Sequence, residues 1–390
     1  MGEPCLGSRE IMHWQFPLSA VSRIFFSALC ATCVILTACG EKQQIKVLPP
    51  AGPQVFVEET PQFFLSQLAP ANQDLTSFTD MAPTISKSLA YVNSKPATAL
   101  AIDQPHIKVT WGELAKTLVR LRELLPRLDA DPGLLEQNFK WVAVPNGIDY
   151  SGYYEPRVQA SRKRKPGYEH PIYRLPPDLD KVRRKNGKYH DRRTIEAGGV
   201  LAGKGLELAW AKDPVDVFFL EIQGSGRLVF DDGTEAYINY AGQNGHKYKS
   251  SGRIMREKGL LKRGDIFEQR EWLRNNPERV REILHENPSF VFFKFGGRGP
   301  TGAIGHTVDD WLSLATDRKF IPLGSIVAYG VNVPDSDRGN VPLRGIGFAQ
   351  DVGGAIKRNR IDIFCGSGER ANYVASHLDA RGPAWILLAK

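Results

Sequence analysis

Cysteine is scarce in this sequence, and its placement argues against several classes of protein. Only five of the 390 residues are cysteines, and four of them lie within the first 39 residues. Cys365 stands alone in the rest of the chain, so neither an internal disulfide nor a cysteine-based metal site is expected there. The sequence also lacks a Gly-x-Ser-x-Gly elbow, a His-Glu-x-x-His helix and a Cys–His pair in an obvious setting. Serine, zinc and thiol hydrolases are therefore disfavoured, and no metal or cofactor is predicted.

Negative charge is under-represented. The formal net charge is +8, which favours an anionic partner, and the positive charge gathers in Arg162–Lys165 and Lys181–Lys185. No zinc-finger spacing or aromatic-rich RNA-binding signature lies nearby, so no nucleic-acid partner is predicted. The simplest interpretation of these runs is a solvated basic loop. The 37 Gly and 26 Pro favour a loop-rich β or α/β protein over a helical bundle.

The N-terminal segment has the pattern of an export signal. The apolar run Ile24–Leu36 is too short to span a bilayer comfortably as a stable helix. It ends in Leu36-Thr-Ala-Cys39, which resembles a bacterial lipobox and predicts that residues 1–38 are a signal peptide. Cys39 would then carry acyl chains that anchor the protein to a membrane, and Gly40 after it resembles the outer-membrane sorting pattern. The alternative is an uncleaved anchor helix that ends in a cysteine by chance.

The first half of the mature chain changes character twice. Residues 39–62 contain several prolines and few apolar periodicities, which indicates a tether. Residues 63–150 begin with helical spacing, because leucines recur every three or four residues from Leu114 to Leu125. From Trp141 onward, short apolar segments broken by glycine and proline predict strands at 142–144 and 150–156.

The second half is predicted to be mainly β. The basic, proline-rich stretch 157–193 predicts a long surface loop. Residues 215–222 predict a strand, and 227–230 with 236–240 predict a hairpin that turns at 231–233. Helical patterns return between about 247 and 285, and a final β-rich block runs from 290 to 388. Two lobes are indicated, with the segment from about 150 to 290 inserted into the other lobe.

Three aspartates in the last block are candidate catalytic residues: Asp317, Asp351 and Asp362. The strand pattern Arg360–Phe364 places Ile361 and Ile363 on one face and Asp362 on the other. Cleavage of a glycosidic bond needs a proton for the leaving oxygen, which a carboxylic acid with a raised pKa can supply. The alternative is that all three are ordinary turn residues.

Polar and aromatic residues elsewhere suit a groove that binds sugars, since rings stack on sugars and amides bind hydroxyls. The candidate substrate-binding residues are Tyr153, Tyr154, Gln223, Ser225, Tyr240, Gln243, Asn244 and His246. Hairpin turns and core aromatics explain the same residues equally well. The Gly-Ser-Gly at 224–226 is a weak candidate phosphate cradle, because no Gly-Lys-Ser/Thr follows and no Rossmann spacing is present.

Several motifs in order carry a resemblance to a known family. They are Gly152-Tyr-Tyr-Glu-Pro156, Gln223-Gly-Ser-Gly226, Tyr240-Ala-Gly-Gln-Asn-Gly-His246, Asn287-Pro-Ser-Phe-Val-Phe-Phe293, Asp317-Arg-Lys-Phe-Ile-Pro-Leu-Gly324, Asp351-Val-Gly-Gly-Ala-Ile356 and Arg360-Ile-Asp-Ile363. From about Tyr150 to Leu388 the chain resembles the membrane-bound lytic murein transglycosylase A family, whose C-terminal part is a three-aspartate domain.

The resemblance implies a mainly β, α+β fold with two domains and a cleft between them. A double-psi β-barrel would be built from residues 63–150 and 289–390, and a smaller β-barrel from the inserted residues 151–288. The implied activity is cleavage of the β-1,4 bond from N-acetylmuramic acid to N-acetylglucosamine in peptidoglycan, leaving a 1,6-anhydromuramoyl end. Asp362 would be the single acid/base, with Asp351 and Asp317 in supporting positions. On physical grounds, an ionised Asp351 nearby would raise the pKa of Asp362.

The implied setting is an outer-membrane lipoprotein that faces the periplasm of a Gram-negative bacterium. Peptidoglycan strands are the implied partner, with cell-wall enzyme complexes as further candidates. Two features depart from the family pattern. Cys365 stands where bulkier or amide side chains are usual, and the basic segment 162–185 is unusually long and charged. That segment is a candidate for binding anionic lipid or the carboxylates of the peptide stems.

Two other functions remain open at this point. A non-catalytic glycan-binding lipoprotein on the same scaffold would keep the aromatic groove but would not need Asp362. A muramidase that uses water would need a second carboxylate at glycosidase spacing, which Asp351 could supply.

Overall fold

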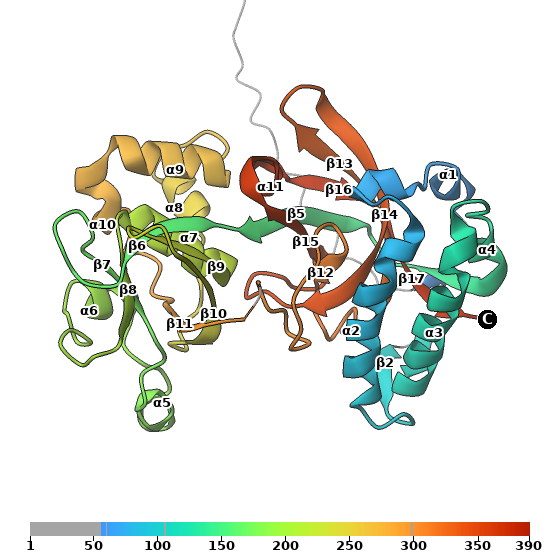
Figure 1. Ribbon diagram of the computed structural model, residues 1–390, viewed down its shortest axis with the longest axis horizontal. Helices are drawn as coiled ribbons and strands as arrows, with labels where there is room; N and C mark the ends of the chain where they lie inside the picture. The colour runs from blue at the N-terminus through green and yellow to red at the C-terminus, as the bar shows by residue number, and fades with distance from the viewer. Residues whose placement is uncertain (1–55, 60, 105–106, 298) are drawn as a thin grey trace, which may run out of the picture. The chain divides into compact units, whose positions relative to one another are not determined.

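The computed structural model describes residues 56–390 except 60, 105, 106 and 298 (Figure 1). The predicted signal peptide, Cys39 and most of the tether lie outside the described residues. The described residues form one compact unit. Two large sheets with helices around them make this unit an α+β structure, as predicted from the sequence. In the described part of the chain, every helix is too short or too polar to cross a membrane.

The larger sheet has nine strands drawn from both ends of the described chain. In spatial order they are β1 (Val57–Glu58), β4 (Phe139–Ala143), β17 (Ala384–Ala389), β13 (Ile326–Asp335), β14 (Gly339–Asp351), β12 (Ser313–Ala315), β15 (Arg360–Ser367), β5 (Ile148–Glu155) and β16 (Ala380–Gly382). The strands predicted at 142–144 and 150–156 correspond to β4 and β5. Closure of this sheet into a double-psi barrel stays a prediction.

Helices cover the nine-stranded sheet. They are α1 (Gln62–Leu65), α2 (Ala82–Asn93), α3 (Trp111–Leu128), α4 (Leu134–Asn138), α11 (Gly368–His377) and the short 3₁₀ helices η1 (Pro70–Gln73) and η2 (Phe78–Met81). A small hairpin, β2 (Leu100–Gln104) and β3 (Ile107–Thr110), leads into α3. Thr110 and Glu113 form a capping box that starts α3, and its stripe of leucines is buried, as the spacing predicts.

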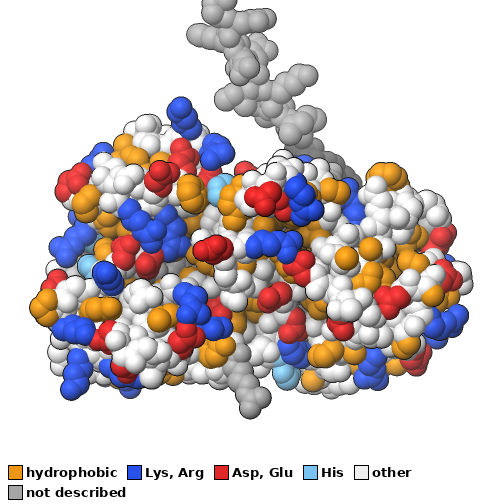
Figure 2. All heavy atoms as spheres, turned by 45° about the horizontal axis from the view of Figure 1, so that its top comes forward, with side chains coloured by type: hydrophobic (Ala, Val, Ile, Leu, Met, Phe, Trp, Pro, Cys, Tyr) orange, Lys and Arg blue, Asp and Glu red, His pale blue; other side chains and the backbone are white. Residues whose placement is uncertain are grey.

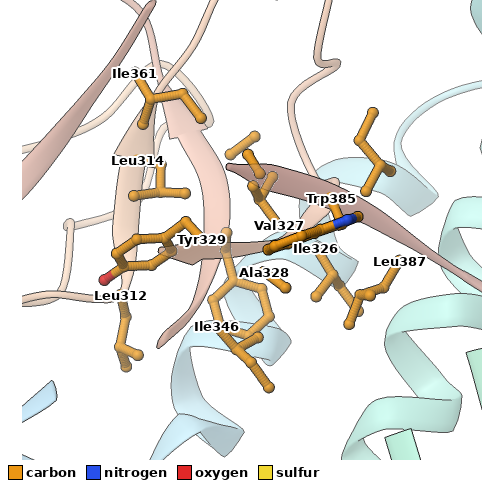
Figure 3. Packing of buried hydrophobic residues seen from close by; sticks show 14 of the residues in the cluster. Leu312, Leu314, Ile326, Val327, Ala328, Tyr329, Ile346, Ile361, Trp385 and Leu387 are labelled. Carbon is orange, nitrogen blue, oxygen red and sulfur yellow. The ribbon is translucent and has the colours of Figure 1, made fainter. Parts of the chain in front are cut away.

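The main hydrophobic core lies beside the central strands of this sheet (Figure 3). Ile361 of β15 and Leu314 of β12 are fully buried there, near the ring of Tyr329. The Tyr329 hydroxyl donates a hydrogen bond to the Trp311 carbonyl at 2.7 Å. Apolar packing on this side of β15 therefore fixes the strand, and the side chains that alternate with Ile361 and Ile363 face the other way.

The second sheet has six strands from the middle of the chain. In spatial order they are β11 (Val291–Phe295), β10 (Glu235–Gln243), β9 (Ser225–Phe230), β6 (Arg157–Ser161), β8 (Glu207–Ala211) and β7 (His170–Tyr173). The associated helices are α5 (Leu179–Asn186), α6 (Arg192–Glu196), α7 (Pro214–Gln223), α8 (Ser251–Glu257), α9 (Ile266–Asn275), η3 (Pro277–Arg279) and α10 (Val280–Leu284). The predicted hairpin is confirmed, because β9 and β10 pair antiparallel.

Two secondary-structure predictions are wrong. Residues 215–222 form helix α7 instead of a strand: Asp213 caps its first turn, Pro214 occupies its first position, and Gly224 ends it with a φ of +76°. The run is apolar around most of the helix because α7 is buried between the sheet and α8–α10. The stretch 157–193 is not one long loop, since it contains β6, β7, α5 and the start of α6.

Strand β5 connects the two sheets. It pairs parallel with β15, and the chain then passes through Pro156 into β6 of the six-stranded sheet (Figure 1). Two strands, β5 and β11, lie near the predicted limits of the inserted domain. All of β5 pairs within the nine-stranded sheet, whereas β11 pairs with β10 in the six-stranded sheet. The domain limits at 151 and 288 stay a prediction.

Candidate active site

A single large groove, with a volume of about 2320 Å³, holds all three candidate catalytic aspartates. One wall comes from the nine-stranded sheet, with residues from β5, β14 and β15. The opposite wall comes from β10, β11, α8 and α9 of the inserted segment. The predicted placement of a cleft between the two parts of the chain therefore has a counterpart in the described structure.

Asp362 lies on β15 with its carboxyl group toward the groove. Its neighbours Ile361 and Ile363 are fully buried on the other face, as the alternation predicts. One carboxyl oxygen, Oδ1, is buried and has no hydrogen-bond partner among the described residues. Burial raises the pKa of Asp362 to about 6, although the Ser151 hydroxyl and the Arg360 charge act in the opposite direction. The carboxyl group can therefore hold a proton near neutral pH.

Ser151 and Arg360 form a pair next to this carboxyl group. In the parallel pairing of β5 and β15, Ser151 lies opposite Asp362. The Arg360 guanidinium donates two hydrogen bonds to the Ser151 hydroxyl oxygen, from Nε at 3.2 Å and Nη2 at 3.1 Å. Because that oxygen accepts from Arg360, the hydroxyl proton is left to point at another acceptor, and the Asp362 carboxylate is adjacent.

Asp351 ends β14 and is held by three hydrogen bonds. Its Oδ1 accepts from the backbone N–H groups of Val352 (2.8 Å) and Ala303 (3.0 Å), and the Tyr153 hydroxyl donates to Oδ2 at 3.1 Å. Burial raises the pKa of Asp351 to about 6 against these bonds, and the charge of Asp362 adds to the rise. From the sequence, the charge of Asp351 was expected to raise the pKa of Asp362. In the structure, the main cause of that raised pKa is burial.

Asp317 has a different environment. Its Oδ1 accepts from the backbone N–H of Lys319 (3.1 Å) and its Oδ2 from that of Arg358 (3.0 Å). Burial alone would raise the pKa of Asp317, but these two bonds and the charges of Lys357 and Lys319 lower it below the ordinary value. Asp317 is therefore an ionised carboxylate that joins two loops at the groove, and it is unsuited to donate a proton.

Six of the eight predicted substrate-binding residues line the groove: Tyr153, Gln223, Ser225, Tyr240, Gln243 and His246. Tyr240 is 48% exposed, so its ring is available for stacking on a sugar. The ring of Tyr153 is buried against Phe364, and its hydroxyl is engaged by Asp351. Tyr153 therefore orients Asp351 instead of stacking on a substrate.

The remaining two predicted residues do not line the groove. Tyr154 is buried, and its hydroxyl accepts a hydrogen bond from Arg270 at 2.6 Å. Asn244 is fully buried, and its amide donates to the carbonyls of His190 and Pro288. Both residues support the fold, because strand alternation turns Tyr154 away from the side that Tyr153 faces and Asn244 ties three loops together.

Sequence reasoning missed Phe295 and Ser151. Phe295 lines the groove from the end of β11 and is 46% exposed, so it offers a second ring beside Tyr240. Strand alternation gave no signal for Phe295, because it predicts the same face as Phe293, which is buried in the core of the inserted segment. Ser151 carried no signal either, because its role depends on the pairing of β5 with β15.

Cys365 is buried behind the site. Its thiol donates to the Ile363 carbonyl at 3.4 Å, and it does not line the groove. The Cys365 side chain packs against Gly152 of β5, where an added Cβ would lie 2.9 Å from the Cys365 Sγ. Within the described residues, no three His, Cys, Asp or Glu side chains are arranged to hold a metal ion.

The arrangement in the groove can carry out acid–base chemistry on a long polymer. It offers one carboxyl group with a free oxygen, a second carboxyl group held by a tyrosine, and exposed rings on the opposite wall. A groove of this volume accommodates several sugar units.

Comparisons with known proteins agree with this geometry. Residues 149–294 match the family described as the MltA specific insert domain, and residues 312–388 match the 3D domain. Membrane-bound lytic murein transglycosylase A from Escherichia coli is 37% identical over 248 residues, which are 62% of this chain and 65% of the relative. The protein of the same name from Vibrio cholerae is 35% identical over 271 residues, covering 66% of this chain and 71% of the relative. The match thus spans slightly less than two thirds of the E. coli relative.

Solved structures give the same result. A membrane-bound lytic murein transglycosylase from Agrobacterium tumefaciens has a TM-score of 0.71 at 28% identity, covering 86% of this chain and 97% of that chain. E. coli MltA with bound chitohexaose has a TM-score of 0.65 at 26% identity, covering 88% of this chain and 97% of that chain. On the extent and identity of these matches, the chain belongs to the membrane-bound lytic murein transglycosylase A family.

Proposed function

We propose that this protein is a lytic transglycosylase that cleaves the β-1,4 bond between N-acetylmuramic acid and N-acetylglucosamine in peptidoglycan and leaves 1,6-anhydromuramoyl ends. The observation that carries the proposal is Asp362: a carboxyl group in the groove with one oxygen that has no hydrogen-bond partner among the described residues, and a pKa raised to about 6. Family membership supports the same reaction.

Asp362 acts first as an acid and then as a base. Its proton passes to the glycosidic oxygen as the bond to C1 of the muramoyl residue breaks, and the N-acetylglucosamine unit leaves as an alcohol. The Asp362 carboxylate then accepts the proton of the C6 hydroxyl as that oxygen bonds to C1. The nucleophile belongs to the substrate, so no water enters the product and no second carboxylate is needed to activate it.

Asp351 stabilises the positive charge that develops at C1. Both acids have a pKa of about 6, so the reactive form is the one in which Asp351 is ionised while Asp362 holds the proton. Three hydrogen bonds fix Asp351 in place. Tyr153 supplies one of these bonds from β5, the strand that also carries Ser151. Both acids are therefore held by the same strand.

The substrate groove is proposed to take a β-1,4-linked amino-sugar polymer. The E. coli relative with bound chitohexaose supports this, because chitohexaose is a short β-1,4-linked chain of amino sugars. Tyr240 and Phe295 are the rings proposed to stack on sugar faces. Gln223, Ser225, Gln243 and His246 are the polar groups proposed to contact hydroxyl and acetamido groups.

We place the protein at the outer membrane, facing the periplasm, with acyl chains on Cys39 as its anchor. The name of the relatives supports attachment to a membrane. The lipobox-like sequence before Cys39 supports the mode of attachment. Such a position brings the groove to the cell wall, where other cell-wall enzymes are the proposed partners.

The test is mass spectrometry of purified peptidoglycan digested by residues 40–390. The wild-type chain should release fragments that end in 1,6-anhydromuramic acid, and Asp362→Asn should lower their rate of release by at least about 100-fold. Asp310→Asn is a matched control, because Asp310 also has a pKa raised by burial but does not line the groove. Reducing ends would identify a hydrolase instead, and absence of any digestion would favour a non-catalytic binding protein.

A further inference from the structure

The loops around Asp317 carry a concentration of positive charge that the proposed acid–base chemistry does not use. Arg318 and Lys319 follow Asp317 directly, and Lys357 and Arg358 lie on the loop before β15. All four side chains are exposed, and none forms an ion pair with another described residue. Across the face in Figure 2, by contrast, Lys and Arg side chains alternate with Asp and Glu.

Asp317 holds these two loops together. Its carboxylate accepts one hydrogen bond from the backbone of each loop, at Lys319 and at Arg358. Arg358 has a φ of +50°, a backbone conformation that is unfavourable for a side chain of this size. Such local strain persists where surrounding contacts impose it, and it concentrates at functional sites. One carboxylate faces four cations here, so the loops keep a net positive charge.

The charge faces the groove. Arg318, Lys319 and Lys357 line it together with Asp351 and Asp362. Hydroxyl and acetamido groups of a glycan are neutral and are recognised by amides, hydroxyls and rings. Unpaired cations beside the acids therefore call for an anionic part of the substrate. In peptidoglycan, that part is the peptide stem, which branches from the muramoyl unit next to the bond to be broken.

The basic segment 162–185 fits this role less well. Arg162 lies over the Phe230 ring and donates to the Thr234 hydroxyl at 3.0 Å, and Lys165 is paired with Asp231. These cations are engaged at the tip of the β9–β10 hairpin. None of residues 162–185 lines the groove that holds the acids.

We propose that Arg318, Lys319 and Lys357 form a cationic subsite that binds the carboxylates of peptidoglycan stems, with Asp317 as the positioning residue that keeps the two loops together. This inference rests on the proposed function, since it names the part of that substrate that these loops recognise. It gives Asp317 a role in binding and none in proton transfer.

The experiment compares two substrates that differ only in stem charge. Uncross-linked glycan strands with intact stems are acetylated at their amines, and half of the sample is then converted to carboxamides. The wild-type chain is expected to show a KM about three- to tenfold higher on the amidated strands, and raised salt should narrow the difference. Lys319→Gln/Lys357→Gln should show nearly the same KM for both substrates.

A matched control is Lys116→Gln/Arg122→Gln, which removes two exposed cations from α3, outside the groove. It should discriminate between the substrates as the wild type does. Equal KM values for the wild type on both substrates would overturn the proposal, and so would full discrimination by the groove double variant. If the wild type releases no anhydro ends from either substrate, the proposed function fails; affinities measured in the Asp362→Asn background then still decide whether these lysines bind the stem carboxylates.

Asp317→Asn separates positioning from catalysis. An amide can accept a hydrogen bond from only one of the two loops, so we expect KM for the carboxylate substrate to rise several-fold while KM for the amidated substrate changes much less. If turnover instead dropped by roughly two orders of magnitude on both substrates while KM stayed the same, Asp317 would act in the chemical step.

Discussion

Asp362 keeps a carboxylate oxygen buried without a hydrogen bond from any residue that the structure describes, an arrangement that works against the folded state at neutral pH. Its pKa of about 6 in the folded protein lies above the value of about 3.9 for an unfolded aspartate. The folded state therefore binds the proton more tightly. The benefit is fully present below pH 4 and is lost as the pH rises through 6.

Because the pKa of Asp362 is raised in the folded protein, Asp362→Asn is expected to stabilise the protein at alkaline pH. At pH 8 the variant should have a free energy of unfolding higher by up to about 3 kcal/mol, because it removes the buried charge. At pH 4 the two proteins should unfold at nearly the same denaturant concentration. Urea unfolding at both pH values provides the measurement, and a variant that is less stable at pH 8 would contradict the described burial.

The same groups predict a narrow pH profile for kcat/KM. Activity should fall as the pH rises through about 6, since Asp362 loses its proton, and should fall below that pH as Asp351 becomes protonated. The two apparent values belong to the pair of acids. Ser151→Ala should move the alkaline limb to higher pH, because the Ser151 hydroxyl lowers the pKa of Asp362. An unchanged limb would show that Ser151 does not contact the acid.

Local alternation allowed part of the site to be predicted from the sequence. The alternation around Asp362 predicted correctly which face of β15 carries its side chain, because Ile361 and Ile363 must be buried on the other face. The same rule applied to β5 would have separated Tyr153 from Tyr154, which were both assigned to the groove. The roles of Ser151 and Phe295 depend on contacts between distant strands, which no local pattern contains.

Helix α11 and strand β5 approach each other closely at the edge of the groove, which Gly152 and Ala375 both line. A Cβ added at Gly152 would lie 2.9 Å from the Ala375 Cα and 2.9 Å from the Cys365 Sγ, too close for either contact. Gly152 is thus required by packing between two elements. Its strand also carries Ser151 and Tyr153, so a shift of β5 reaches both acids.

Gly152→Ala is therefore expected to lower the free energy of unfolding by about 1–3 kcal/mol and to reduce activity with it. Gly354→Ala is the control, because Gly354 is exposed and a Cβ there meets nothing within 4 Å. Thermal unfolding of both variants measures the difference. Equal midpoints would mean that α11 moves freely away from β5.

Helix α7 shows why one element was predicted wrongly. Its run of apolar residues fits a buried strand and a buried helix equally well, since periodicity disappears when most of a surface is covered. The signals at its ends, Asp213 with Pro214 and then Gly224, were sufficient to decide for a helix. For such an apolar run, the capping residues at its ends distinguish a helix from a strand better than the run itself does.

At the scale of the whole molecule, the passage from β5 to the second sheet is fastened by a buried ion pair. The Glu155 carboxylate is 3% exposed and accepts from Arg227 of β9 at 2.9 Å, while its Oε1 has no hydrogen-bond partner within the described residues. Arg227 also donates to Glu235 and to the Tyr237 hydroxyl on β10. Burial raises the pKa of Glu155, and the charge of Arg227 lowers it.

Removing only the Arg227 cation should therefore destabilise the protein more than removing both charges of the pair. Arg227→Gln leaves Glu155 buried without its partner and is expected to cost roughly 3 kcal/mol of stability. The double variant Glu155→Gln/Arg227→Gln should regain part of that loss, because no charge is then buried. A double-mutant cycle by urea unfolding gives the coupling, and strictly additive losses would contradict the pairing.

The organisation of the whole chain, like the site, was predicted only in part from the sequence. The insertion of one β-rich segment into another was indicated by the change in pattern near residues 150 and 290. The way in which the two sheets share β5 was not, because the pairing of β5 with β15 joins residues more than 200 positions apart.

Strand β5 is a rigid element that the two sheets have in common. It enters from the nine-stranded sheet, passes the acid on β15, and continues into β6 as the first strand of the inserted sheet. A displacement of the inserted wall would therefore act on the strand that carries Ser151 and Tyr153, whose hydroxyl groups contact the two acids.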